Sequence, residues 1–280
     1  MRLSSAYHFL FIAALTAAAA LVPASVGAQT GELVDRTELR VCEDPSNLPF
    51  SNEKKEGFEN KIADIMGAAL NLPVHYVWFP ETVGFVRNTL QARQCDLMMG
   101  TVAGDDLVQN TNPYYYTTYV MVFRSDKPLP ASAAGFDDPS LKDLKFGVVA
   151  RTPPTDLLVR HGLMDHVKSY ALVVDTRYES PPQEMIKDVA NGTIDVGLVW
   201  GPIAGYYISK EKLPLKMVPV RGEPNAARMD YHITMGVRAN EPEWRRKINA
   251  VIRERQPEIT AVLRDYGVPL LDEQGRLMTQ

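Results

Sequence analysis

Hydrophobic and polar positions alternate along the first third of the chain in blocks that are typical of strands and helices. Residues 38–44 (ELRVCED) contain a short apolar run that ends in two acids before a proline, as expected at the end of a buried strand. In the next block, apolar residues recur at helical spacing, at Phe58, Ile62, Ile65, Met66, Ala69 and Leu70. This pattern predicts a helix with one buried face.

The same alternation continues over the following thirty residues. Residues 72–79 (LPVHYVWF) are rich in β-branched and aromatic side chains and predict a second strand. Residues 83–94 (VGFVRNTLQARQ) predict a second helix, and residues 95–100 (CDLMMG) predict a third strand that is fully buried. Strands that alternate with helices predict a parallel sheet with helices on its faces.

A second set of alternating elements occupies the middle of the chain. The sequence predicts strands at residues 144–150, 168–175 and 193–200, with helices at 152–163 and 181–192 between them. Prolines stand in the first turn of both helices, where a missing N–H costs nothing, and a glycine follows the second helix. This set therefore predicts a second α/β lobe.

Two further predicted strands, at residues 119–126 and 231–238, have no helix that connects them to either lobe. A long helix with apolar residues at helical spacing follows the second of them, from about Glu241. We interpret the two strands as connections that cross from one lobe to the other, so that together they form a hinge.

These elements predict an α/β fold of two lobes, a clamshell with a mixed sheet in each lobe and two hinge-crossing strands. The first lobe is discontinuous and comprises residues 36–121 and 239–280. The second lobe, residues 122–238, is inserted between them.

The N-terminus has the pattern of a secretory signal peptide, predicted at residues 1–28. Arg2 precedes an uncharged run over residues 9–22, and small side chains at Val26 and Ala28 are typical of a cleavage site after Ala28. An uncleaved membrane anchor is the alternative, although an apolar run of about 14 residues is shorter than the ~20 that span a bilayer. The sequence predicts export to the periplasm and no stable membrane association after cleavage.

Composition and motifs exclude several classes of function. The chain has 30 basic and 34 acidic residues, a net charge of −4, and no basic block, so a nucleic acid is not expected as a partner. It has no Gly-rich phosphate loop, nucleophile elbow or metal-ligand motif of the zinc-protease type. Asp105 and Asp106 are interpreted as a turn, since adjacent side chains rarely converge on one ion. We expect no resident cofactor and no metal site.

The two cysteines, Cys42 and Cys95, are in an export context in which a disulfide is permitted. The predicted strands place Cys42 near the end of one strand and Cys95 at the start of its neighbour. Several residues of offset at ~3.3 Å each exceed the reach of a disulfide. We therefore expect no bridge, although the sequence leaves the pairing open.

Several segments resemble those of a known family. Residues 39–63 (LRVCEDPSNLPFSNEKKEGFENKIA), 84–100 (GFVRNTLQARQCDLMMG) and 112–120 (NPYYYTTYV) resemble type II periplasmic solute-binding proteins. Within that superfamily they are most similar to the MoxJ/XoxJ type, the binding-protein homologues associated with quinoprotein methanol dehydrogenases. The resemblance covers nearly all of residues 38–270, and it implies that the loop from Asp44 to Phe50 lines a cleft between the lobes.

The chain departs from its amino-acid-binding relatives at two positions of that cleft. Such receptors hold the ligand carboxylate with an arginine about nine residues after the third strand, and here that position is Val108. They pair the ligand's amino group with an aspartate that aligns with Gly201 and Pro202. Both charge partners are missing, so we do not expect binding of a free α-amino acid in that manner.

Aromatic and apolar residues surround the predicted cleft instead, with a few polar residues among them. The candidate ligand- or partner-binding residues are Asp44, Asn47, Phe50, Trp78, Phe85, Arg87, Thr101, Tyr114, Arg151, Thr152, Trp200 and Tyr206. Tyr and Trp suit a large, partly apolar ligand or a protein segment. The alternative for each aromatic residue is a place in the core. Arg151 with Thr152 predicts either an anion site or a plain helix cap with an exposed arginine.

Three hypotheses of function follow from the resemblance and these departures. The first is a non-catalytic periplasmic accessory or maturation factor for a pyrroloquinoline-quinone (PQQ) methanol dehydrogenase, of the calcium or lanthanide type. It would hold the dehydrogenase or its cofactor in the aromatic cleft between the lobes. The second is the solute receptor of an ABC transporter for a small ligand that is not an amino acid. The third is a clamshell dehydratase, with Glu43 or Asp44 as general acid.

Overall fold

A computed structural model describes residues 36–130 and 135–278. The predicted signal peptide lies outside the described residues. Residues Glu32–Gln280 form one compact unit. Within the described ranges, no helix is both long enough and apolar enough to cross a membrane.

A mixed sheet forms the centre of the first lobe. Strand β1 (Leu39–Glu43) lies between β4 (Val74–Trp78) and β5 (Leu97–Val102) and is parallel to both. Strand β12 (Asp230–Val237) pairs antiparallel with β5 on its other side. The predicted strands at residues 38–44, 72–79 and 95–100 are thus present in the predicted parallel arrangement.

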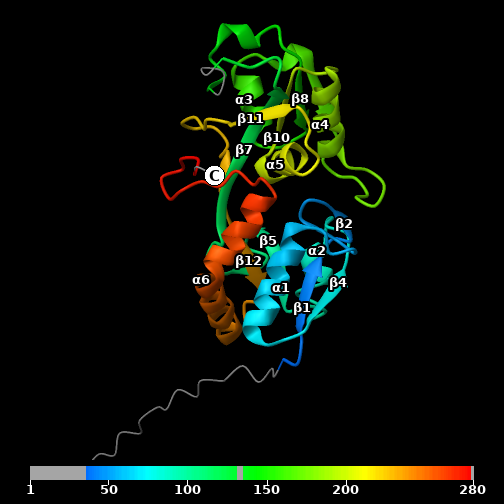
Figure 1. The fold of residues 1–280 in the computed structure, drawn as a ribbon, viewed down its shortest axis with the longest axis vertical. Coiled ribbons are helices and arrows are strands. Elements are labelled where there is room, and N and C mark those ends of the chain that lie inside the picture. Colours follow the sequence, from blue (N-terminus) through cyan, green and yellow to red (C-terminus); the bar gives the residue numbers. More distant parts are fainter. Residues whose placement is uncertain (1–35, 131–134, 279–280) are drawn as a thin grey trace, which may run out of the picture. The chain divides into compact units, whose positions relative to one another are not determined.

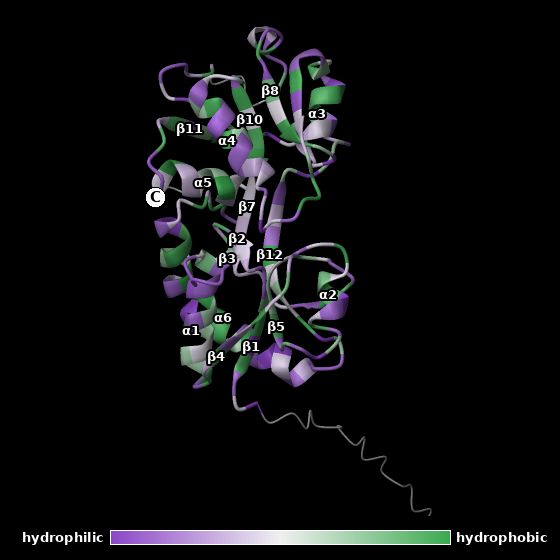
Figure 2. Ribbon diagram, turned by 90° about the vertical axis from the view of Figure 1, so that its right-hand side faces the viewer, coloured by the Kyte–Doolittle hydropathy of each residue, from purple (hydrophilic) through white to green (hydrophobic). Residues whose placement is uncertain are grey.

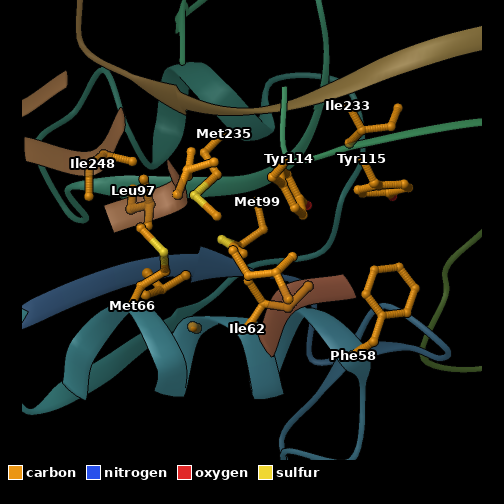
Figure 3. Close-up of a cluster of buried hydrophobic side chains, with 14 of the residues drawn as sticks. Phe58, Ile62, Met66, Leu97, Met99, Tyr114, Tyr115, Ile233, Met235 and Ile248 are labelled. Carbon is orange, nitrogen blue, oxygen red and sulfur yellow. The ribbon is translucent and has the colours of Figure 1, made fainter. Parts of the chain in front are cut away.

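Two long helices pack together in the first lobe, α1 (Phe58–Leu70) and α6 (Pro242–Asp265). Each carries both hydrophobic and hydrophilic residues, as a helix with one buried face should (Figure 2). Phe58, Ile62 and Met66 extend from α1 toward the side chains of β5, β12 and α6 in the core (Figure 3). Of the six residues predicted for the buried face of α1, these three are buried, and the remaining three are half-buried.

Short elements connect this sheet to its loops. Strands β2 (Ser46–Asn47) and β3 (Ser51–Asn52) form a small antiparallel hairpin between β1 and α1. Helix α2 (Phe85–Asn88) lies between β4 and β5, and β6 (Gln109–Asn110) pairs with the end of β12.

A second mixed sheet forms the centre of the second lobe. Strands β10 (Val196–Trp200), β8 (Phe146–Val149) and β9 (Val167–Tyr170) are parallel neighbours in that order. Strand β11 (Leu215–Pro219) runs antiparallel to the long strand β7 (Tyr115–Arg124), which also pairs with β10.

Helices accompany this second sheet and give the lobe cores of its own (Figure 1). They are α3 (Pro154–Arg160), α4 (Pro181–Asn191) and α5 (Gly201–Ser209), with 3₁₀ turns at Pro139–Leu141 and Met164–His166. Helices α3 and α4 match predicted helices, with α3 shorter than expected at both ends. Helix α5 and strand β11 were not predicted.

Strand β7 belongs to both sheets. Its first half pairs with β12, with Thr117 opposite Tyr231, and its second half pairs with β10, with Val120 opposite Val199. Strand β12 likewise continues from β7 to β5. The α/β fold class with two lobes and two crossing strands is confirmed, whereas the exact lobe boundaries stay a prediction.

Two predicted elements are shorter than expected. The helix predicted over residues 83–94 ends at Asn88, where the hydroxyl of Thr89 donates to the carbonyl of Phe85, and the chain then continues in turns. The strand predicted over residues 168–175 ends at Tyr170. β9 is an edge strand, and its one neighbour, β8, ends at Val149, so no partner remains for the residues that follow.

The expectation that the cysteines are out of reach is wrong, because Cys42 and Cys95 form a disulfide with a Cα–Cα distance of 5.6 Å. The prediction assumed that Cys95 is the first residue of an extended strand. In the structure β5 begins only at Leu97, and Cys95 lies in the turn before it, in one buried cluster with Cys42 and Leu90.

Candidate functional site

A cavity of about 510 Å³, the large cavity, is lined by residues of both lobes. The hairpin β2–β3 of the first lobe contributes Ser46, Asn47 and Asn52 to its lining. The second lobe contributes Trp200 at the end of β10, residues of α5, and much of residues 171–180, here called the 171–180 segment. This segment connects β9 to α4.

The 171–180 segment exposes apolar side chains beside the large cavity. Leu172 and Tyr178 line the cavity and are nevertheless 50% and 80% exposed, and the adjacent Val173 is 69% exposed. Arg177, the one basic residue of the lining, is bound by Asp175 of the same segment at 2.6 Å. Leu172, Val173 and Tyr178 therefore give this wall apolar and aromatic contact area, beside the charged side chains of Arg177 and Glu179.

Asp44 connects three parts of the structure through its carboxylate. The backbone N–H groups of Ser46 and Glu81 donate to its two oxygens, at 2.7 Å each. The hydroxyl of Thr176, in the 171–180 segment, donates to the same carboxylate at 3.1 Å. This buried acid thus fixes the loop after β1 and connects it to the second lobe.

A second cavity, the small cavity, has a volume of about 140 Å³ and an acidic lining. Its lining residues are Cys42, Glu43, Asp44, Asn47, Phe50, Glu59, Glu81, Phe85, Met99, Gly100 and Trp200. Four of these carry carboxyl groups, and none is Lys, Arg or His. Asn47 and Trp200 line both cavities, so the two share a wall.

Glu43 and Glu59 are the most deeply buried acids of the small cavity, 4% and 5% exposed. Burial raises the pKa of Glu43 to about 8, and the nearby carboxylates of Glu81 and Asp44 add to this effect. Burial and the charge of Glu43 also raise the pKa of Glu59 well above its usual value. Both effects disfavour the charged forms of the two carboxyl groups.

The structure brings six of the twelve predicted residues to one or both cavities. Asp44, Phe50 and Phe85 line the small cavity, Thr152 lines the large one, and Asn47 and Trp200 line both.

The other six predicted residues line neither cavity. Tyr114 is 1% exposed in the core, where its hydroxyl accepts from the N–H of Gly100, and Thr101 is bonded to Thr234. Trp78 stacks on Tyr76 and Tyr206 on Tyr266, while Arg87 and Arg151 are exposed. The geometry gives these six no support as site residues.

Arg151 and Thr152 were predicted to form either an anion site or a plain helix cap, and the structure does not place Thr152 as a cap of α3. The hydroxyl of Thr152 donates to the carbonyl of Val149 at 2.6 Å, and no side chain caps α3. Arg151 has a positive φ of 64° and makes the turn between β8 and α3.

Sequence reasoning missed Glu59, Thr176, Tyr178 and Tyr207, all of which line a cavity. Glu59 is the second residue of α1, where an acid is common for reasons of helix stability alone. A strand was predicted over residues 168–175, and α5 was not predicted. The sequence therefore did not indicate that side chains of the 171–180 segment and of α5 line a cavity.

The positions of the two missing charge partners are filled by packing. Val108 contacts Gly236, where an added Cβ would lie 3.0 Å from its side chain. Gly201 and Pro202 are buried in the first turn of α5, and an added Cβ at Gly201 would lie 2.5 Å from the carbonyl oxygen of Thr118. A metal centre has no support either, since no group of three or more His, Cys, Asp or Glu in the described residues is arranged to hold an ion.

Two sheets connected by crossing strands, with cavities that residues of both lobes line, define a bacterial solute-binding protein. The family model of bacterial extracellular solute-binding proteins, family 3, matches residues 39–266, and the chain belongs to this family.

Within the family, the chain is similar to MoxJ of Methylorubrum extorquens, at 30% identity over 92% of this chain and 93% of the relative. It is also similar to the crystal structure of the periplasmic binding protein XoxJ from Methylobacterium extorquens AM1, with 41% identity and a TM-score of 0.71 over 84% of this chain and all of that one. These relatives confirm the predicted resemblance to the MoxJ/XoxJ type. The fold is shared by an ancestral cationic amino acid solute-binding protein. The two are 21% identical, with a TM-score of 0.64 over 82% of this chain and 96% of that one.

Proposed function

We propose that this chain is a non-catalytic periplasmic accessory protein for a PQQ-dependent methanol dehydrogenase, which it binds during maturation. The likeness to MoxJ and XoxJ over more than four fifths of the chain supports this role. The observation that carries it is the exposure of Leu172, Val173 and Tyr178 in one segment beside the large cavity, because large exposed apolar side chains gathered at one place are typical of a protein-binding site.

The partner is the enzyme rather than its free cofactor. PQQ carries three carboxylates and requires several cationic groups to bind it tightly. Arg177 is the one basic residue of the large cavity, and its guanidinium is held by Asp175. The small cavity is lined by acids, which would repel the cofactor.

The test is isothermal titration of the purified apo-dehydrogenase into the mature protein. We expect micromolar or tighter binding that Leu172→Ser and Tyr178→Ser each weaken at least tenfold, because each removes a large apolar contact. Val159→Ser is the matched control, since Val159 is 59% exposed on α3 and lines neither cavity. The absence of binding at micromolar concentration, or equal effects of all three variants, would contradict the proposal.

A solute receptor of an ABC transporter is the second candidate, and the size of the large cavity favours it. About 510 Å³ is within the range of small-molecule sites, which is about 300–1,000 Å³. A thermal-shift screen of organic acids, sugars and amines separates the two roles, because a tight ligand raises the melting temperature by mass action. A strong ligand with no dehydrogenase binding would favour the receptor.

The dehydratase hypothesis has weaker support. Glu43 has the raised pKa of a general acid. No His or Lys lines the small cavity to act as its base, however, so we propose no catalytic residue.

A further inference from the structure

Residues 265–271, here called the C-terminal brace, follow the body of α6 and contact both lobes. Figure 1 shows this segment, in red, between α6 and α5. Alternate residues of the brace are buried in the core of the first lobe, namely Tyr266, Val268 and Leu270. The residues between them, Gly267 and Pro269, contact α5 of the second lobe. The brace is therefore a third connection between the lobes, in addition to the two crossing strands.

Helix α5 packs on the brace with its backbone. Gly201 and Gly205 are about one helical turn apart, and both are buried. A Cβ added at Gly201 would lie 2.5 Å from the ring of Pro269, and a Cβ added at Gly205 would collide with the carbonyl oxygen of Gly267. Only glycine permits so close an approach. Because surfaces packed this closely do not deform continuously, we expect α5 and the brace to move together.

Side chains extend this contact along α5. The ring of Tyr206 stacks on that of Tyr266, with the centroids 6.1 Å apart, and the ammonium group of Lys210 binds the carboxylate of Asp265 at 2.5 Å. The hydroxyl of Tyr266 donates to the carbonyl of Glu56, just before α1. Tyr266 thus connects α5 of the second lobe to the first lobe.

The brace also bonds to β7 where this strand passes from one sheet to the other. The hydroxyl of Thr117 donates to the carbonyl of Pro269 at 2.7 Å, and the N–H of Leu271 donates to the carbonyl of Tyr116 at 2.9 Å. Thr117 and Tyr116 also pair with β12. A hinge motion requires a few residues that change φ and ψ. Here hydrogen bonds from both β12 and the brace oppose such a change.

Helix α5 lies between the brace and the large cavity. Ile203 and Tyr207 line the cavity. The helical repeat places them on the face of α5 opposite to Gly201 and Gly205, which contact the brace. Any displacement of α5 from the brace would therefore move a wall of the cavity.

We propose that the C-terminal brace locks the angle between the lobes, so that the large cavity is a preformed site that does not close around its occupant by a hinge motion. Thr176 and Asp44 join the lobes beside the cavities, and the brace joins them at the crossing strands. A rotation of one lobe would have to break contacts at both places. Gly205 is thus a positioning residue that acts through α5 on Ile203 and Tyr207. An ordinary solute receptor, in contrast, closes by such a rotation.

The test is a distance measurement between spin labels by pulsed electron paramagnetic resonance. Lys61→Cys on α1 and Lys187→Cys on α4 place one label on each lobe, because both lysines are exposed and the two native cysteines are paired. A reference pair at Lys142→Cys and Lys187→Cys lies within the second lobe and gives the width that is due to the labels alone. We expect the distance distribution between the lobes to be no broader than this reference.

Gly205→Ala should make the distribution between the lobes about twofold broader, because the added Cβ separates α5 from the brace. Gly222→Ala is the matched control and should change nothing, since no atom lies within 4 Å of a Cβ added at this exposed glycine. Thr117→Val keeps the shape of the side chain and removes the donor to Pro269. Amide exchange in residues 265–271 should then accelerate about fivefold, and exchange in β8 should not change.

A wild-type distribution between the lobes that is broader than the reference would overturn the proposal, and so would an unchanged distribution in folded Gly205→Ala. If Gly205→Ala does not fold, the comparison of the two label pairs in the wild type and the exchange of Thr117→Val still decide the question. The measurement needs neither ligand nor partner. Its outcome is therefore independent of whether the chain binds a dehydrogenase.

Discussion

The hydroxyl of Thr176 lies 3.1 and 3.3 Å from the two carboxylate oxygens of Asp44 and donates its one proton to this carboxylate. Asp44 follows β1 of the first lobe, whereas Thr176 lies in the 171–180 segment of the second. Residues 132 positions apart in the chain are thereby joined beside both cavities. This contact holds the 171–180 segment against the first lobe.

Replacing Thr176 with valine keeps the shape of the side chain and removes the donor. Loss of a hydrogen bond of this kind costs about 1 kcal/mol, so we expect the segment to open about fivefold more often. Amide hydrogen exchange within residues 171–180 should accelerate by that factor, while exchange in β8 and β10 should not change. Thr193→Val is the control, because the hydroxyl of Thr193 bonds only to Asn191 of the same turn. Unaltered exchange in the segment would show that the contact does not hold it.

The secondary structure of the first lobe was predictable because its elements are long and periodic. Helix α1 shows six apolar residues at helical spacing, and β1 carries the apolar residues Leu39, Val41 and Cys42, so local pattern and tertiary packing agree. The 171–180 segment illustrates the opposite case. Its apolar run ALVV is typical of a strand. The strand with which it would pair, β8, ends at Val149, and the local sequence does not indicate where a partner strand ends.

The candidate site was predictable only in part, for a similar reason. Asp44, Asn47 and Phe50 lie in the loop after the first strand, and the family resemblance implied that this loop lines the cleft, in agreement with ligand binding at the carboxyl ends of strands. Glu59 was missed because its role depends on the burial that Gly100 and Glu43 create around it, which is a property of the folded chain. Tyr114 was assigned to the site although it is 1% exposed in the core, since an aromatic residue suits either place.

A buried ion network stabilises the first lobe, with Asp96 at its centre. Arg238 donates to Asp96 at 2.7 Å and Arg40 at 2.8 Å, and Glu241 binds both Arg238 and Arg36. Burial alone would raise the pKa of Asp96, but the hydrogen bonds from Arg40 and Arg238 outweigh it and lower the pKa. The charged form of Asp96 is therefore favoured in the folded state.

We expect Asp96→Asn to lower the free energy of unfolding by about 3–5 kcal/mol at pH 7, because it removes the carboxylate that accepts from Arg40 and one of the two carboxylates that pair with the buried Arg238. The folded pKa lies below the unfolded one, so the stabilisation is present above about pH 4 and is lost as the pH falls further. Urea unfolding at pH 7 and at pH 3 should show the difference between wild type and variant shrink. Asp126→Asn, which breaks an exposed pair with Arg124, should cost under about 1 kcal/mol. If the two variants lost the same free energy of unfolding, burial would not be what makes the Asp96 network stabilising.

The raised pKa of Glu43 predicts the opposite dependence on pH. Its folded pKa of about 8 exceeds the unfolded value, so the stabilisation is fully present below about pH 4.3 and is lost as the pH rises to 8. Each unit of difference is worth about 1.4 kcal/mol. We expect Glu43→Gln, which cannot ionise, to become progressively more stable than wild type between pH 5 and 8 in urea unfolding. Glu53→Gln should follow the wild type at every pH, and a constant offset for Glu43→Gln would show that its carboxyl is not protonated.

The disulfide between Cys42 and Cys95 should contribute substantially to the stability of the first lobe. It joins residues 53 positions apart, and a closed loop of this length reduces the entropy of the unfolded chain by an amount worth about 4 kcal/mol. Both cysteines are buried among Leu90, Phe85 and Val86, so the paired substitution Cys42→Ala and Cys95→Ala keeps small apolar side chains in the cluster. We expect the double variant to unfold at a lower urea concentration than the oxidised wild type.

A reducing agent should lower the urea midpoint of the wild type toward that of the variant. It should leave the midpoint of the variant unchanged, because the variant has no other cysteine. Mass spectrometry verifies that the bridge is lost on reduction. If the urea midpoint of the wild type is then unchanged, the cluster is held by packing alone.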